Sequence, residues 1–309
     1  VSMHSAQNYN RNEVRLAKFT LLPTSIPKQE FFKAKEIQTL VNKLIHRVAY
    51  DHDFLIETLK TTVEADEFTS QLFNIYKIVQ NEGFAQNLSL GLLRSDYMLD
   101  KDNKIKQVEV NTIAASFGGL STQVSKIHKY VLNELNYSEK TSQLPENNST
   151  DGLASGLAEA WKAYNKAESV ILIVVEDPTY NIFDQRYLEL SIRQENPEIR
   201  VIRRSFKYLS ANASLTANKE LIVDNHEIAV VYYRTGYETS AYPSDKEWDV
   251  RLLMERSRAI KCPSIQYHLA GTKKIQQVLA QSRVLKRFLS EDEAEKLQEA
   301  FVALYALDF

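Results

Sequence analysis

The sequence predicts an α/β protein in which a small, largely parallel sheet is inserted between more helical segments. A continuous apolar run, SVILIVVED at 169–177, is rich in β-branched residues, which is typical of a strand buried on both faces. From there to residue 265, strand and helix patterns alternate, as in a parallel sheet covered by helices. The flanking segments carry apolar residues at helical spacing. We therefore expect an α/β unit at 169–265 within a larger helical body.

The N-terminal part is predicted to contain three helices and a hairpin. Apolar residues recur every three or four positions in PKQEFFKAKEIQTLVNKLIHRVAY, where Pro27 suits the first helical turn. Asp51 and Asp53 are alternative caps for the second helix, and Gly83 suits the end of the third. The period then changes to two on both sides of a polar turn, KDN, which indicates an antiparallel hairpin. The expected order is an irregular start (1–26), helices at 27–50, 51–66 and 67–83, and strands at 88–100 and 104–110.

The remaining elements follow from the same two periods. Residues 139–152 are polar and contain a proline, an asparagine pair and a glycine, so they are predicted to form a linker. The expected helices are 120–135, 152–166, 181–194, 244–262, 272–282 and 290–307. The expected strands are 169–177, 199–206, 220–225 and 227–234.

The composition is that of a globular protein without a strong electrostatic field. The chain has 309 residues, 44% of them hydrophobic, which is enough for one large or two ordinary domains. Its 38 Lys and Arg are balanced by 40 Asp and Glu, which argues against nucleic acid or an anionic membrane as a partner. No apolar run approaches the roughly 20 residues that span a bilayer, and the N-terminus lacks the apolar core of a signal peptide. The one cysteine, Cys262, excludes an internal disulfide and is expected to be a buried small hydrophobe, so a cytoplasmic protein is expected.

The segment KQVEVNTIAASFGGLSTQ, residues 106–123, is the first candidate for chemistry. Glu109 and Asn111 are two residues apart on the predicted strand, so both side chains leave the same face. A carboxylate and an amide oxygen pointing together suit Mg²⁺, although a solvated strand face has the same pattern. The Gly118-Gly119 pair follows, in a chain with 8 glycines in all. A turn of small residues lets backbone N–H groups approach an anion.

Two basic residues stand where they could serve the same site. Arg94 lies on the preceding hairpin strand, and its guanidinium suits a carboxylate or a phosphate. An ion pair inside the hairpin, with Asp96 or Glu109, is the alternative. Lys273 follows a Gly-Thr turn in LAGTKKIQQ. It suits a nucleotide phosphate, or it is a solvated helix start.

Polar residues also follow the ends of the predicted parallel strands. Ligands of open α/β sheets bind outside the carboxyl ends of the strands. Arg234 stands at such an end, followed by Gly236 and Tyr237 in VVYYRTGY. Asn181 and Gln185 in NIFDQR follow the preceding buried strand, so we expect them to face the same crevice. For Asn181, a helix cap is the alternative.

Six blocks, in this order, resemble eukaryotic-type glutathione synthetase: LRSDYM, QVEVNTIAASFGGL, NIFDQR, EIAVVYYRTGY, LLMERSRAIKCPSI and LAGTKKIQQ. Their number and order make the resemblance specific, whereas each motif alone is weak. The resemblance implies an ATP-grasp-like main body with an inserted small α/β substrate-binding domain. The implied parts are an N-terminal helical part with the hairpin at 1–167, the inserted domain at 168–272, and a helical return to the body at 273–309.

The resemblance also implies a reaction and its partners. The family joins γ-glutamylcysteine to glycine with ATP and Mg²⁺, as a homodimer. The implied route phosphorylates the cysteinyl carboxylate to an acyl phosphate, which the amine of glycine then attacks. This chemistry requires metal and cationic groups at the phosphoryl group and a well-placed acceptor, rather than an enzyme nucleophile.

The resemblance assigns roles by position. Glu109 and Asn111 are implied Mg²⁺ ligands, and Glu109 and Lys273 are implied ATP contacts. Arg94 is implied to be the catalytic arginine that holds substrate near the reacting carboxylate. The residues implied to bind γ-glutamylcysteine are Arg94, Ile113, Ala114, Ala115, Ser116, Asn181, Gln185, Arg234, Thr235, Gly236 and Tyr237.

Two departures from the family bear on these expectations. The family often has a serine where this chain has Ala114, and an acidic residue near Thr179, which affects individual peptide contacts. The chain also stops at LYALDF, before the family's glycine-rich lid loop, a further Mg²⁺ carboxylate and the arginine for glycine. We therefore expect an ATP-grasp core that is incomplete at the C-terminus, and little ligase activity from this chain alone.

Two other hypotheses stay open at the level of sequence. A truncated, non-catalytic chain would bind γ-glutamyl peptides or dimerise with an intact copy. A related ligase would use β-alanine or serine in place of glycine. Neither the acceptor amino acid nor the oligomeric state follows from these residues.

Overall fold

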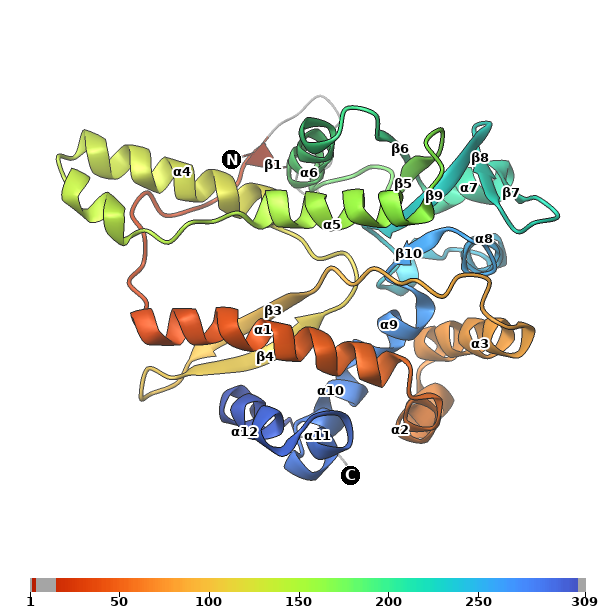
Figure 1. The fold of residues 1–309 in the computed structure, drawn as a ribbon, viewed down its shortest axis with the longest axis horizontal. Helices are drawn as coiled ribbons and strands as arrows, with labels where there is room; N and C mark the ends of the chain where they lie inside the picture. The colour runs from red at the N-terminus through yellow and green to blue at the C-terminus, as the bar shows by residue number, and fades with distance from the viewer. Residues whose placement is uncertain (1, 4–14, 305–309) are drawn as a thin grey trace.

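The computed structural model describes residues 2–3 and 15–304, so much of the predicted irregular start at 1–26 lies outside the described residues. The chain forms two layers, an upper one built on a sheet and a lower one of helices and a hairpin (Figure 1). The upper layer contains η1 (Ser138–Gln143), η2 (Thr239–Ala241) and helices α4 (Gly118–Glu134), α5 (Ser149–Tyr164), α6 (Ile182–Glu195), α7 (Phe206–Asn212) and α8 (Asp245–Glu255). The lower layer contains α1 (Lys28–Ala49), α2 (His52–Ala65), α3 (Glu67–Glu82), α9 (Ile265–Ala270), α10 (Lys273–Leu279), α11 (Ser282–Phe288), α12 (Glu291–Ala300) and strands β3 (Arg94–Leu99) and β4 (Ile105–Asn111).

The upper layer is organised by a six-stranded sheet in the order β6-β5-β9-β8-β7, with β10 also paired with β9. Its strands are β5 (Val170–Val174), β6 (Arg200–Arg204), β7 (Ala213–Leu215), β8 (Leu221–Val223), β9 (His226–Tyr233) and β10 (Ile260–Cys262). Strand β5 runs parallel to β6 and β9, and β10 runs parallel to β9, whereas β7 and β8 pair antiparallel. The predicted largely parallel sheet is therefore confirmed. A further pair, β1 (Ser2–Met3) and β2 (Arg15–Leu16), is antiparallel.

Both faces of the sheet are covered. Ile171 and Ile173 of β5 pack into a core shared with α5 and α6, while Leu172 and Val174 pack into a second core with α7 and α8. All five residues of β5 are buried, as its unbroken apolar sequence predicts. Because both faces are covered, a ligand can reach the sheet at the carboxyl ends of its strands, where polar residues follow β5 and β9.

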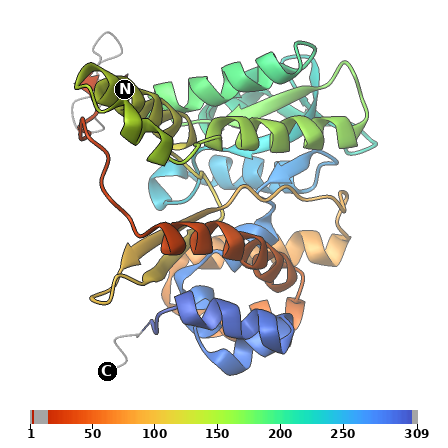
Figure 2. The same cartoon turned by 60° about the vertical axis from the view of Figure 1, so that its left-hand side comes forward.

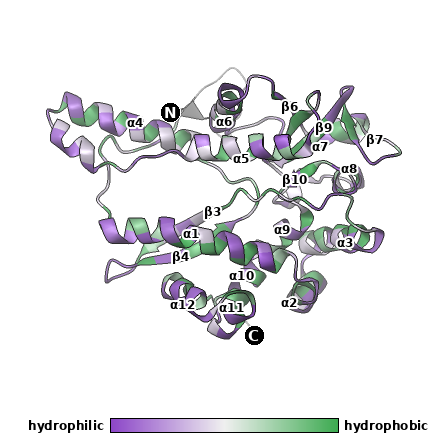
Figure 3. Cartoon of the chain, in the orientation of Figure 1, coloured by the Kyte–Doolittle hydropathy of each residue, from purple (hydrophilic) through white to green (hydrophobic). Residues whose placement is uncertain are grey.

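A separate core holds the lower layer together. Helix α1 contributes Val41, Leu44, Ile45 and Val48 at helical spacing, and α9 to α12 pack against them together with the hairpin β3–β4. Figure 2 shows that the chain returns to this layer after the sheet, so that α1 and α12 lie side by side. In Figure 3 the helices carry hydrophilic and hydrophobic positions in alternation, as expected for helices with one buried face.

Local signals set several helix ends as predicted. Asp51, and not Asp53, caps α2 by accepting from Phe54 N at 3.0 Å. Gly83 ends α3 with a φ of 80°, a conformation that glycine adopts at no steric cost. Pro27 stands at the N-cap of α1.

The helix predicted at 244–262 is wrong beyond Glu255, where α8 ends, and its last three residues form strand β10. This strand has Lys261 at its centre, buried, with Nζ donating to Ser257 O at 2.9 Å. A three-residue strand centred on lysine carries no periodic signal. The prediction that Cys262 is buried is confirmed, and burial raises the pKa of its thiol to about 12.

Two other elements are shorter than predicted. The strand predicted at 88–100 starts only at Arg94, because Leu90 N donates instead to Lys261 O in the upper layer, at 3.2 Å. The helix predicted at 290–307 ends at Ala300, and positions 305–307 lie outside the described residues. Phe301 forms a β-bridge with Gln107 of β4 where a further helical turn was expected, so in both cases a tertiary contact competes with the local pattern.

Candidate active site

The hairpin β3–β4 brings four polar side chains to one face. Arg94 pairs with Asn111 across the ladder, and Asp96 pairs with Glu109. Residues directly opposite in an antiparallel pair share a face, as do residues two apart on one strand. All four side chains therefore point the same way, and we call them, together with Lys273, the hairpin group.

Hydrogen bonds connect these side chains. Arg94 donates from Nε and Nη2 to the two oxygens of Asp96, at 2.8 and 2.9 Å, while its Nη2 lies 3.9 Å from Glu109 Oε1. Asn111 Nδ2 donates to Glu109 Oε1 at 3.2 Å and to Asp96 Oδ2 at 3.3 Å. The alternative considered for Arg94, a hairpin ion pair, is thus present. Asp96 was predicted only as a partner in that pair, although its period-two spacing from Arg94 places it on the same face.

Lys273 supplies the second cation of the hairpin group. It is the first residue of α10, and its ammonium forms an ion pair with Glu109 Oε2. The bond from Lys273, followed by the one from Asn111, lowers the pKa of Glu109 to about 2. The carboxylate is therefore ionised at neutral pH and is paired with a side chain that is 70% exposed.

The oxygens of this face suit a hard divalent cation. Glu109 and Asp96 offer carboxylates, and Asn111 offers an amide oxygen because its Nδ2 is already donating. Within the described part of the chain, no group of three or more His, Cys, Asp or Glu is arranged to hold a metal. A cation bound at the hairpin would therefore keep water ligands, which is the habit of Mg²⁺.

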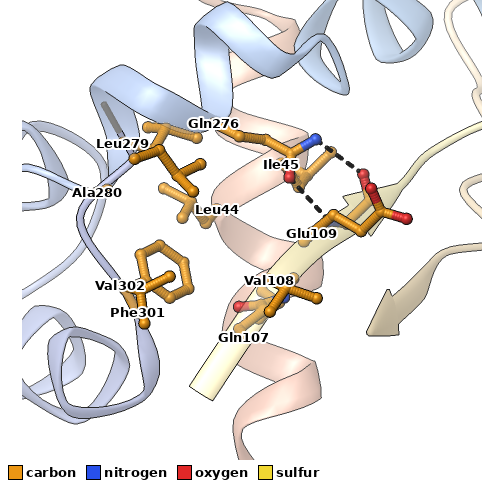
Figure 4. Close-up of a pocket in the computed structure, with 13 residues that line it drawn as sticks. Leu44, Ile45, Gln107, Val108, Glu109, Gln276, Leu279, Ala280, Phe301 and Val302 are labelled. Carbon is orange, nitrogen blue, oxygen red and sulfur yellow. Dashed lines mark hydrogen bonds between the residues drawn. The ribbon is translucent and has the colours of Figure 1, made fainter. Parts of the chain in front are cut away.

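The side chain of Gln276 holds α10 against β4 (Figure 4). Its Oε1 accepts from Val110 N at 2.8 Å, and its Nε2 donates to Val110 O at 3.0 Å and to Gly271 O at 2.8 Å. Val110 lies between the two predicted metal ligands. The amide of Gln276 makes with its backbone the hydrogen bonds that a neighbouring strand would make at this edge of β4. Because Lys273 begins the same helix, Gln276 also places the cation relative to its carboxylate.

The contact between α9–α10 and the end of β4 depends on a glycine. A Cβ added to Gly271 would lie 2.1 Å from Oγ1 of Thr112. Only glycine allows this approach. Beside it lies a pocket between α1, β4 and α10, lined mainly by apolar side chains such as Leu44, Ile45 and Leu279 (Figure 4). Most of the lining belongs to the lower core, and Glu109 of the polar face also lines the pocket.

The turn after β4 is held by Arg234, which follows β9. Ala114 and Phe117 have positive φ values, 51° and 72°. Arg234 Nη1 donates to Ala114 O at 2.5 Å and to Ala115 O at 3.0 Å, and its Nη2 donates to Ser116 Oγ at 2.8 Å. The side chain of Arg234 is 3% exposed. Its guanidinium therefore stabilises the turn that the resemblance assigns to the peptide.

The Gly-Gly turn binds a carboxylate of the chain itself. Asp184 of α6 accepts from Phe117 N at 2.9 Å and from Leu120 N at 3.1 Å, and it lies 3.4 Å from Arg234 Nη2. A Cβ on Gly119 would lie 2.8 Å from the backbone oxygen of Asp184, so glycine lets α4 start against α6. The N–H groups that were expected to meet an anion thus meet Asp184. Sequence reasoning missed it because an acidic residue in a first helical turn is common.

The segment after Arg234 forms one wall of the sheet edge. Thr235 is buried, and Gly236 has a φ of 95°. A Cβ added to Gly236 would lie 2.7 Å from the hydroxyl oxygen of Tyr242, which is too close for a side chain. Tyr237 donates its hydroxyl to Glu176 Oε1 at 3.1 Å. Burial raises the pKa of Glu176. Glu176 was not predicted as a site residue, although it directly follows the buried strand.

Asn181 and Gln185 lie one turn apart at the start of α6, and both are buried. Asn181 occupies the N-cap position, but its side chain makes no capping hydrogen bond, and its Oδ1 is buried without a hydrogen-bond partner. The capping alternative for Asn181 is therefore wrong. Gln185 Oε1 accepts from Arg203 Nη2 at 2.6 Å.

The predicted residues thus fall into two groups joined by the turn at 112–117. The first is the hairpin group. The second, which we call the sheet-edge group, consists of Ser116, Glu176, Asn181, Asp184, Gln185, Arg203, Arg234 and Tyr237. Ile113 of the turn packs against the core below the sheet rather than presenting a polar group.

Fold and site together define an α/β protein in which a cation-suited hairpin adjoins the polar carboxyl edge of an inserted sheet. The chain matches, over residues 1–309, the family described as eukaryotic glutathione synthase, ATP binding domain, and it belongs to this family. The predicted family is therefore confirmed.

Relatives agree with this assignment. The chain is 42% identical to the glutathione synthetase of Mus musculus and 41% identical to that of Homo sapiens, each over 100% of this chain and 66% of the relative. The chain therefore spans 66% of the length of these relatives. A relative from Solanum lycopersicum is 41% identical over 94% of the chain and 54% of its own length, and it is named as chloroplastic. The predicted cytoplasmic location stays a prediction.

A solved structure shares the fold. A glutathione synthetase-like effector from Globodera pallida, in its apo form, superposes with a TM-score of 0.81 at 22% identity, covering 97% of this chain and 66% of that one. The predicted α/β class is confirmed. None of the described helices combines the length and apolar character needed to cross a bilayer.

Proposed function

We propose that this protein acts as a glutathione synthetase. The reaction is the ATP- and Mg²⁺-dependent ligation of γ-glutamylcysteine and glycine. The cysteinyl carboxylate attacks the γ-phosphorus of ATP and releases ADP. The glycine amine then attacks the acyl carbon, a C–N bond forms, the bond to phosphate breaks, and the amine loses a proton. The observation that carries the proposal is the hairpin group, in a chain that belongs to this family along its whole length.

The hairpin group is the proposed nucleotide and metal end of the site. Mg²⁺, when bound, neutralises charge on the transferring phosphoryl group. Glu109 and Asn111 would hold it, because the carboxylate is ionised and the amide oxygen points from the same face. Lys273, already paired with Glu109, would turn its ammonium to phosphate oxygens when another cation meets that carboxylate. Arg94 would orient the acceptor carboxylate.

The sheet-edge group is the proposed peptide end of the site. Arg234 and Asp184 fix the turn at 112–117, so that Ser116 and the turn's backbone are pre-organised for γ-glutamylcysteine. Asn181, Gln185 and the segment from Thr235 to Tyr237 complete the proposed pocket. The route needs no enzyme nucleophile, which agrees with the buried thiol of Cys262.

We also propose the division into parts at 1–167, 168–272 and 273–309, and a homodimer. The alternation of layers along the chain supports an inserted sheet unit, because the strands from β5 to β10 lie between two visits to the lower layer. Helices α4 and α5, which precede residue 167, already lie in the upper layer with this sheet. Family membership supports the dimer.

Calorimetry on this 309-residue chain tests the binding half of the proposal. γ-Glutamylcysteine and MgATP should each bind, and Glu109→Gln should weaken MgATP while leaving the peptide unchanged. Product formation from both substrates and glycine is then measured on the longest natural form of the protein. Absence of peptide binding would overturn the proposal. Binding without any turnover in that longest form would instead favour a non-catalytic binding protein.

A further inference from the structure

A buried ion pair lies at the junction of the two layers, outside both groups of the candidate site. Arg251 of α8 is 0% exposed, and its Nη2 donates to Glu255 Oε1 at 2.8 Å, one helical turn away. Helix α8 belongs to the upper layer, whereas α9, whose first backbone N–H donates to Glu255, belongs to the lower layer (Figure 1). The pair therefore connects the two layers as well as two turns of one helix.

Each member of the pair contacts a different element. The Arg251 guanidinium lies over the ring of Tyr233, the last residue of β9, at 3.8 Å from the ring centroid. Glu255 Oε2 accepts from Ile265 N, at the start of α9, at 3.3 Å. Two charged side chains thereby join the end of β9 to the start of α9.

Both of these elements lead directly into the candidate site. Arg234, which holds the turn at 112–117, directly follows β9. At its other end α9 leads through Gly271, which packs against Thr112, to Lys273 of the hairpin group. The position of α9 against the sheet therefore determines where Lys273 lies relative to Arg234.

Stability alone does not account for this ion pair. Arg251 Nε and Nη1 are buried without a hydrogen-bond partner in the described chain. Apolar residues of similar volume often replace a buried ion pair without loss of stability. Apolar contacts are non-directional, whereas a guanidinium, a carboxylate and a backbone N–H in series are satisfied in one arrangement. The pair is therefore suited to select one docking geometry of the two layers.

We propose that Arg251 and Glu255 are positioning residues that fix α9, and with it Lys273, in one register against the carboxyl edge of the sheet. This rests on the proposed function, in which the acceptor carboxylate and the nucleotide phosphate must meet. Both side chains are buried, so they act through β9 and α9 and not on a substrate. A misplacement of about 1 Å caused by a remote substitution can lower turnover about a hundredfold. The pair thus contributes to turnover rather than to the binding of either substrate alone.

A distance measurement tests the positioning without any substrate. Spin labels are attached to the 309-residue chain at Lys207→Cys on α7 and Arg283→Cys on α11, two exposed positions in different layers. The one natural cysteine, Cys262, is buried and does not compete for the label. Double electron–electron resonance should give a single narrow distance for the chain with the ion pair. The same chain with Arg251→Met and Glu255→Leu should give a broadened or shifted one.

Turnover is the second readout, measured on the longest natural form of the protein. In the same double variant kcat should fall about tenfold to a hundredfold, while KM for γ-glutamylcysteine and for MgATP stays nearly unchanged. The melting temperature should change by about 4 °C or less, so a loss of folded protein would not explain the loss of kcat. Arg251→Lys, which keeps a positive charge beside Glu255, should retain more of kcat than the double variant.

The matched control is a second arginine–glutamate pair between the same two layers. Arg256, which follows α8, donates from Nε and Nη2 to the carboxylate of Glu82 on α3, and the two side chains are 39% and 38% exposed. Because a solvated ion pair contributes little, Arg256→Met with Glu82→Gln should leave both the spin-label distance and kcat unchanged.

The outcomes separate this inference from the proposed function. If the unaltered protein forms no product, the proposed function fails, and the role of the pair in turnover fails with it. If the unaltered protein is active, this inference alone is overturned when the double variant keeps either the original distance or the original kcat. Should the double variant not fold in the thermal melt, Glu255→Gln is measured in its place. A changed distance with a lowered kcat then supports the inference, and an unchanged value of either overturns it.

Discussion

The two halves of the candidate site use charge in opposite ways. In the sheet-edge group, Arg234 and Asp184 are 3% and 5% exposed, and both bind the backbone of the turn that joins the halves. In the hairpin group, Arg94 is 34% exposed, and Lys273 is 70% exposed. The first pair is part of the fold's internal structure. The second can exchange partners, because water can replace what each ion loses.

This difference matches the two tasks that we propose. A peptide is recognised by groups that are already in place, which reduces the ordering cost of binding. A nucleotide with its metal brings its own large charges, and the side chains that meet them must first release one another. We therefore expect substitutions in the sheet-edge group to lower the stability of the fold, and substitutions in the hairpin group to change mainly the electrostatics of the site.

The largest effect is expected from Arg234→Met. Removing the guanidinium leaves the buried carboxylate of Asp184 without its ion-pair partner and removes three hydrogen bonds to the turn, and the loss of one partner of a buried ion pair costs about 3–5 kcal/mol in the free energy of unfolding. The matched control is Arg94→Met, which should cost about 1 kcal/mol or less because the ion pair is partly solvated. Urea unfolding of both variants measures the difference. Equal losses in the free energy of unfolding of the two variants would contradict the proposed difference between the two groups.

Gln276→Leu should have the next largest effect. It removes three hydrogen bonds and leaves the backbone groups of Val110 without partners, at a cost of about 1–3 kcal/mol. The Val110 amide should also lose protection in hydrogen exchange. Gln277→Leu is the control, since Gln277 accepts only from Lys274 at 3.1 Å in the described chain. An unchanged Val110 amide in Gln276→Leu would show that β4 does not depend on this contact.

A smaller effect concerns the pH dependence contributed by Glu109. Its pKa is lowered from 4.5 to about 2, so its ionised form stabilises the folded chain above pH 4.5, and this contribution is lost as the pH falls towards 2. For a partly exposed pair the size is about 1 kcal/mol or less. Unfolding of the unaltered protein and of Glu109→Gln should differ at pH 7 and converge near pH 2. A difference that persists at low pH would contradict the ion pair with Lys273.

The smallest effect is expected from Tyr237→Phe. The lost hydrogen bond to Glu176 is half exposed, so the free energy of unfolding should fall by only about 0.5 kcal/mol. The pKa of Glu176, which burial raises and the tyrosine hydroxyl lowers, should rise further in the variant. Carboxyl NMR titration measures it. A fall in that pKa would show that the hydroxyl does not donate to this carboxylate.

Much of the scaffold was predictable because its signals are local. The period-two pattern around Glu109 and Asn111 predicted a shared face, and the ladder register confirms it. The cap at Asp51 and the turn at Gly83 follow from the conformational preferences of single residues. Strand β10 was not predicted, because its central residue, Lys261, is buried by means of a hydrogen bond to Ser257 O, and no local sequence pattern indicates such a bond.

The sequence by itself therefore determined the class of fold, the family and the face on which Glu109 and Asn111 lie, since periodicity and ordered motifs are properties of neighbouring residues. Only the tertiary structure decided which groups complete the site. Asp184 reaches Phe117 across 67 positions, and Gln276 reaches Val110 across 166. Such pairs form because packed helices and strands must satisfy buried donors and acceptors wherever they meet, and that meeting depends on the whole fold.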